Sequence, residues 1–73
     1  MKRTRPTPQK RVAKRIQKVR KAKGLTQEVF AEHLGVSLGR VGKIERGIYA
    51  LNVRTLAKIA KVLEVKVRDL IPF

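Results

Sequence analysis

The sequence has no cysteine, one histidine (His33) and only five acidic residues, and each of these scarcities excludes a class of protein. Without thiols the chain forms no disulfide and no thiolate metal site. One imidazole and a few scattered carboxylates do not make a metal cluster, so we expect no metal and no cofactor. The sequence shows no nucleophile–base arrangement, no paired carboxylates and no phosphate-cradling loop, so we do not expect an enzyme.

Long apolar runs and aromatic residues are also scarce. No segment approaches the roughly 18 consecutive apolar residues of a transmembrane helix, and no apolar signal-peptide segment follows the basic N-terminus. We therefore expect a cytoplasmic protein that does not bind membranes. Two Phe and one Tyr in 73 residues leave the core to aliphatic side chains, and this length supports one small domain.

Positive charge, by contrast, is abundant. Nineteen Lys and Arg residues against five acids give a formal net charge of +14. The charge is concentrated near the N-terminus, since residues 1–23 contain 11 basic residues and no acid. A field of this sign attracts a polyanion. Nucleic acid is favoured over a membrane surface, because regularly placed glycines and capping residues indicate a compact helical domain.

Prolines, caps and glycines divide the chain into an arm and a helical domain. Pro6 and Pro8 predict a disordered basic arm over residues 1–9, followed by one domain over residues 10–73. Thr26, Ser37 and Asn52 are the expected N-caps of three helices. Apolar residues at helical spacing predict five helices, at about residues 10–23, 27–34, 38–46, 53–63 and 67–71.

The second and third predicted helices, with Gly35 in the turn between them, have the size of a helix-turn-helix unit. On the third helix, positions 39, 42, 43 and 46 share the side opposite Val41 and Ile44, the expected core residues. A recognition helix presents such a side to the major groove, where each base pair has a distinct pattern of donors and acceptors.

Residues 25–47, LTQEVFAEHLGVSLGRVGKIERG, resemble the Cro/phage-repressor (XRE-type) helix-turn-helix family. The likeness rests on the opening LTQ, the alanine at 31, the turn LGVS at 34–37 and the ending IERG at 44–47, and residues 55–65 look like the fourth helix of the family. Spanning about residues 15–71, it implies an all-α, compact five-helix, lambda-repressor-like DNA-binding domain with a flexible basic N-terminal arm. It also implies a bacterial, archaeal or phage origin.

The resemblance and the charge pattern assign roles to individual residues. The positions that face base edges are Leu38, Gly39, Arg40 and Lys43. The expected phosphate-binding residues are Gln27, Ser37, Arg46, Lys14, Arg15 and Lys18. Lys2, Arg3 and Arg5 of the arm are expected to follow the duplex. Arg20 and Glu45 match a structural ion pair that bridges the first helix to the end of the third.

The reading face departs from the family pattern, because relatives place polar residues where this chain has Leu38, Gly39 and Gly42. One hypothesis is that the glycines let the helix backbone approach the groove closely, while Leu38 contacts a thymine methyl and Arg40 takes a guanine. The alternative is that these positions are merely tolerant and that binding is weakly specific and mostly electrostatic.

The leading prediction is a sequence-selective regulator of transcription that binds double-stranded DNA. We expect a repressor-type homodimer that associates through the fourth helix and the C-terminal segment. An alternative is an antitoxin-type protein that binds a partner protein through the apolar residues of 48–51 and 67–73. These apolar residues are equally compatible with a local extension of the core. A third alternative is a weakly specific nucleic-acid-binding factor.

Overall fold

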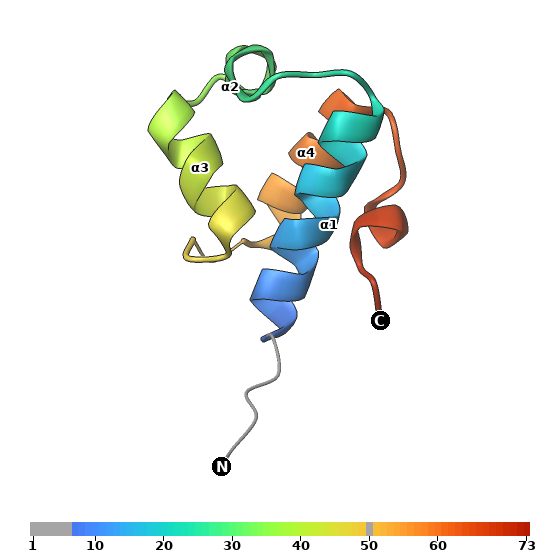
Figure 1. Cartoon of the computed structure of the whole chain (residues 1–73). Helices are drawn as coiled ribbons and strands as arrows, with labels where there is room; N and C mark the ends of the chain where they lie inside the picture. The colour runs from blue at the N-terminus through green and yellow to red at the C-terminus, as the bar shows by residue number, and fades with distance from the viewer. Residues whose placement is uncertain (1–6, 50) are drawn as a thin grey trace.

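Four α-helices and one short 3₁₀ helix make up the part of the chain that the computed structural model describes, residues 7–49 and 51–73. Figure 1 shows α1 crossing in front of α4, with α3 on one side and the 3₁₀ helix on the other. The predicted all-α fold is confirmed, although the fifth helix is a 3₁₀ turn and no α-helix. The elements are α1 (Pro8–Ala22), α2 (Gln27–Leu34), α3 (Leu38–Arg46), α4 (Val53–Leu63) and η1 (Val67–Leu70).

Side-chain caps fix the beginnings of α2, α3 and α4. Each capping oxygen accepts a hydrogen bond from the backbone N–H three residues further on. The N···O distances are 3.1 Å for Thr26, 3.1 Å for Ser37 and 2.8 Å for Asn52. Because these caps and the glycines after two of the helices act locally, the bounds predicted for the three helices agree with the structure.

The first helix begins earlier than predicted. Thr7 is its N-cap and accepts from the Lys10 N–H at 3.2 Å, and Pro8 takes the first helical position. Proline suits this position because its φ is already helical and its missing N–H would have no partner there. Residues 8 and 9, which were expected to belong to the arm, are therefore part of α1. Residues 1–6 lie outside the described residues.

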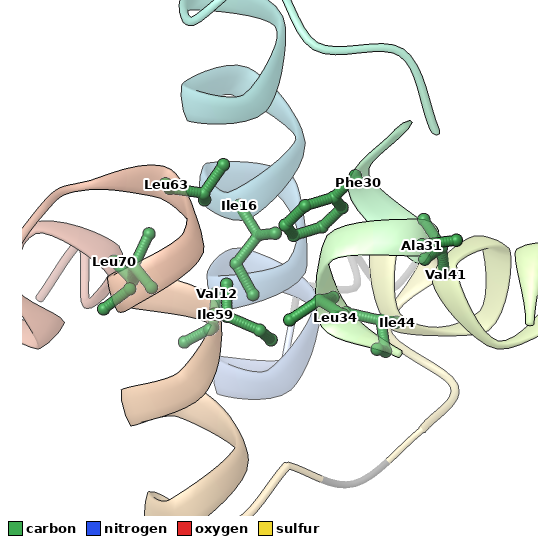
Figure 2. Close-up of a cluster of buried hydrophobic side chains, with 11 residues drawn as sticks. Val12, Ile16, Phe30, Ala31, Leu34, Val41, Ile44, Ile59, Leu63 and Leu70 are labelled. Carbon is green, nitrogen blue, oxygen red and sulfur yellow. The ribbon is translucent and has the colours of Figure 1, made fainter. Parts of the chain in front are cut away.

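The core is aliphatic with a single phenylalanine at its centre. Figure 2 shows Phe30 beside Ile16, with side chains from α3, α4 and η1 closing around them. Phe30, Ile16, Val41, Ile59 and Leu70 are all fully buried. The predicted core residues of α3, Val41 and Ile44, are both buried, which confirms that prediction.

In the loop after α3, more of the described apolar side chains pack against the core than face solvent. Tyr49 and Leu51 are half-buried and pack against the core cluster, whereas Ile48 is 61% exposed. Tyr49 and Leu51 also line a small hollow of about 130 Å³ together with Val12 and Leu56. In the C-terminal segment, Val67 and Ile71 are half-buried in the same way, and Phe73 remains exposed. Most of the apolar side chains described in these two segments thus serve the interior of the domain.

Candidate nucleic-acid interface

Helices α2 and α3 pack against each other and are joined by the short turn of residues 35–37. Val41 and Ile44 point into the core. The opposite side of α3 is open to solvent, and within it Gly39, Arg40 and Lys43 are exposed. Leu38 at the start of the helix is 46% exposed. The four predicted base-reading residues therefore lie on the exposed side of a helix whose opposite side packs in the core.

Among the described residues, no packing contact requires a glycine at position 39 or 42 of this exposed side. A Cβ atom placed on Gly39 would meet only the Ser37 hydroxyl oxygen, at 3.9 Å, and one on Gly42 would meet nothing within 4 Å. Each glycine nevertheless costs a helix interior roughly 1 kcal/mol relative to alanine. Packing within the described part of the chain does not account for this cost.

Arg40 is held in place by Tyr49, a contact that sequence analysis did not find. Its Nη1 donates a hydrogen bond to the tyrosine hydroxyl at 2.7 Å, and its guanidinium carbon lies 4.5 Å from the centre of the tyrosine ring. The two residues are nine positions apart, on either side of the left-handed Gly47. No periodic signal relates a helix residue to a loop residue beyond such a turn, so local sequence patterns do not reveal the pair.

A buried polar network joins α1, α2 and α3. Arg20 donates from Nε and Nη2 to the two carboxylate oxygens of Glu45, at 2.6 and 3.1 Å, and from Nη1 to the Leu25 carbonyl at 2.6 Å. The expected pair of Arg20 and Glu45 is therefore present. Gln27, expected at a phosphate, is half-buried and donates from Nε2 to Glu45 at 2.9 Å. This bond joins the start of α2 to the end of α3.

A cationic groove of about 740 Å³ runs along the outer side of α1 to the end of α3. The only acid among its lining residues is Glu45, whose carboxylate Arg20 already neutralises. Three α1 residues predicted to bind phosphate, and Arg46 of α3, therefore share one surface. The basic residues that line the groove are Lys10, Arg11, Lys14, Arg15, Lys18 and Arg46.

Two of these cations also hold the C-terminal segment. Arg15 donates from Nε to the Asp69 carbonyl at 2.9 Å, and Arg11 donates from Nη2 to the Pro72 carbonyl at 3.4 Å. The Arg11 guanidinium lies 5.1 Å from the centre of the Phe73 ring. Arg15 was predicted only as a phosphate ligand, and the structure gives it this second, structural role.

The remaining predicted site residues are placed as follows. The Ser37 hydroxyl caps α3 at its exposed beginning. Lys2, Arg3 and Arg5 lie outside the described residues.

Within residues 7–49 and 51–73, no group of three or more His, Cys, Asp or Glu side chains is placed to hold a metal ion. No helix found in these two ranges is long and apolar enough to cross a membrane.

The fold and this surface define a helix-turn-helix protein. Residues 16–70 match the sequence profile of the helix-turn-helix family, and the chain belongs to that family. The match begins within α1 and ends with η1, so it includes α2, the turn of residues 35–37 and the whole of α3.

Two curated relatives carry the description of uncharacterized HTH-type transcriptional regulators. One is YazB of Bacillus subtilis, 41% identical over 59 residues that cover 81% of this chain and 86% of the relative. The other, from Archaeoglobus fulgidus, is 36% identical over 59 residues, covering 81% of this chain and 84% of the relative.

Solved structures of regulators superpose closely. The restriction-modification controller protein C.AhdI of Aeromonas hydrophila has a TM-score of 0.80 and 32% identity, covering 85% of this chain and 94% of the other. The clp gene regulator ClgR of Corynebacterium glutamicum has a TM-score of 0.91 and 27% identity, covering 96% and 90%.

Proposed function

We propose that the chain is a sequence-selective, repressor-type regulator that places α3 in the major groove of a target duplex. That it is a DNA-binding regulator of transcription follows from its family and from its similarity to regulators over more than four-fifths of its length. A duplex-binding regulator works beside the chromosome, which in bacteria and archaea is in the cytoplasm.

One observation carries the proposal: the exposed side of α3 meets, at Arg46, a groove that six cations among residues 7–49 and 51–73 line. The glycines of α3 leave its backbone accessible, and the cations of α1 supply an attraction to phosphate, which contributes a large share of the affinity of DNA-binding proteins. In this arrangement Leu38, Gly39, Arg40 and Lys43 face base edges. Ser37, Lys14, Lys18 and Arg46 contact the backbone.

We also propose that two copies act together on a two-fold symmetric site. A single recognition helix reads few base pairs, and half-sites one helical turn apart, about 34–36 Å, double the contacts. Val53 at the start of α4 is 78% exposed and Phe73 is 65% exposed, which supports α4 and the C-terminal segment as the contact region. Sedimentation of the protein with and without duplex measures this directly.

Selection of bound duplexes from a random pool tests the reading of sequence. We expect a consensus with two related half-sites. Lys43→Ala should relax the preference at one base pair, whereas Lys14→Ala should weaken binding to all duplexes alike. If no consensus emerges, or if the two variants behave identically, the protein is a weakly specific binder and the close-approach role of the glycines is wrong.

A protein partner is the second candidate function. The exposed Ile48 and Phe73 are apolar side chains of the two segments to which the antitoxin-type alternative assigned partner binding. The half-burial of Tyr49, Leu51 and Ile71 leaves a small surface for this purpose. Copurification of a stoichiometric second protein that dissociates on Ile48→Asp would favour this function over DNA binding alone.

A further inference from the structure

We propose that Tyr49 is a positioning residue that fixes Arg40 for the reading of one guanine in each half-site. This inference rests on the proposed function and deepens it, because it names the residue that determines specificity at one base pair. Its basis is the double contact between the two side chains, a 2.7 Å hydrogen bond and a stacked guanidinium.

Tyr49 has the properties of a fixed support. Tyr49 is half-buried against the core, and it lines one hollow together with Pro8 and Val12 of α1, Leu56 of α4 and Leu51 of its own loop. Arg40, by contrast, is exposed, and an exposed arginine ordinarily samples many rotamers. The ring therefore holds the guanidinium in one place before any ligand arrives, and such preorganisation removes part of the entropy loss on binding.

The contact with Tyr49 leaves one edge of the Arg40 guanidinium free to donate to a base. A guanidinium carries five N–H donors, and Tyr49 accepts from Nη1 alone. Within the described residues, the Arg40 guanidinium makes no other hydrogen bond, and the backbone N–H of Arg40 donates to the Ser37 hydroxyl. The edge formed by Nε and Nη2 therefore has two donors for O6 and N7 of a guanine, the arrangement by which arginine most often reads a base.

The test is a comparison of the base preferences of the wild type, Arg40→Ala, Tyr49→Ala and Tyr49→Phe. Bound duplexes selected from a random pool give the preference at every position. Arg40→Ala should abolish one guanine preference, and Tyr49→Ala should weaken the same preference about tenfold while leaving the others intact. Tyr49→Phe, which keeps the stacked ring and loses the hydroxyl, should give an intermediate loss. Lys43→Ala is the matched control, because it should alter a different position.

A double-mutant cycle between Arg40→Ala and Tyr49→Ala separates positioning from mere stability. We expect the two changes to be coupled in binding to the consensus duplex and uncoupled when the guanine is replaced. Coupling that appears only in thermal unfolding of the free protein overturns the inference. So does an equal loss of affinity for all duplexes, because Arg40 would then contact a phosphate. If Tyr49→Ala does not fold, Tyr49→Phe decides by the same criteria.

The wild type distinguishes the two ways to fail. A wild-type protein without any base preference refutes the proposed function, and the inference with it. A wild-type guanine preference that Tyr49→Phe and Tyr49→Ala leave unchanged refutes the role of Tyr49 alone.

Discussion

Arg20 in α1 and Glu45 in α3 form a bidentate ion pair whose side chains are only 6% and 1% exposed. The pair joins α1 to the end of α3. Gln27 and the Leu25 carbonyl take up further bonds of the same two groups. The orientation of α3 therefore depends on charges that water hardly reaches.

Removing one member of this pair should destabilise the domain severely. Arg20→Ala or Glu45→Ala leaves the other charge buried and unpaired, and we expect a loss of about 3–5 kcal/mol in the free energy of unfolding. Urea titration measures it. The double variant Arg20→Met with Glu45→Leu should recover much of the loss, because apolar groups of similar size replace both charges. A single variant that loses under about 1 kcal/mol would contradict the buried character of the pair.

Gly47 and Gly35 make a matched pair for separating backbone strain from packing. Both have left-handed φ, +75° and +74°, but a Cβ on Gly47 would lie 2.9 Å from the Cα of Lys10, whereas one on Gly35 meets nothing within 4 Å. Gly35→Ala should cost about 1–2 kcal/mol from strain alone. Gly47→Ala should cost a further 1–3 kcal/mol, roughly, because α1 and α3 must move apart. Equal losses in thermal denaturation would show that the two helices are loosely packed there.

Alanine at Gly39 or Gly42 should have opposite effects on stability and on binding. Each substitution has room in the free protein and should raise the stability of α3 by about 0.5–1 kcal/mol. If the α3 backbone lies close to the base pairs in the major groove of DNA, each substitution should also lower the affinity for the selected duplex. Thermal melts without DNA and titrations with DNA measure the two effects separately. Unchanged affinity in both variants would assign the glycines no part in binding.

Salt should weaken binding steeply. Neutralisation of 6–10 phosphates corresponds to a roughly 10³–10⁵-fold loss of affinity between 50 and 200 mM salt. Lys18→Ala, in the cationic groove, should reduce the slope of log affinity against log salt by about one unit. The control is Lys21→Ala, which removes the same charge from an exposed site of α1 that does not line the groove. A flat salt response of the wild type would exclude the electrostatic account altogether.

Local signals explain which parts of this fold the sequence predicts well. The caps Thr26, Ser37 and Asn52 act within one turn, and so the bounds of α2, α3 and α4 are readable from residue types alone. The Thr7–Pro8 pair carries a signal of the same kind, but the two prolines nearby suggested an extended arm. A proline at position 8 is compatible with an extended arm and with the first turn of a helix. The hydrogen bond from the Lys10 N–H to the Thr7 hydroxyl shows that it begins a helix.

Tertiary contacts explain what the sequence does not predict. Gln27 donates to Glu45 across 18 residues, and Arg15 donates to Asp69 across 54. The positive charge of Arg15 predicts affinity for phosphate and equally for a carbonyl oxygen, so its partner depends on where η1 packs. Helical periodicity, by contrast, is enough to predict that Lys43 is exposed and that the basic residues of α1 in the cationic groove share one side of the helix.

The hydrogen bonds from Arg11 and Arg15 to the C-terminal carbonyls close a chain segment of some sixty residues into a ring. Closing so long a ring is entropically unfavourable until the intervening helices have assembled. Residues 67–73 should therefore dock last during folding and detach first under mild denaturant. In deuterated solvent, the hydrogen-bonded amides of Asp69 and Ile71 should accordingly lose their hydrogens well before those around Phe30.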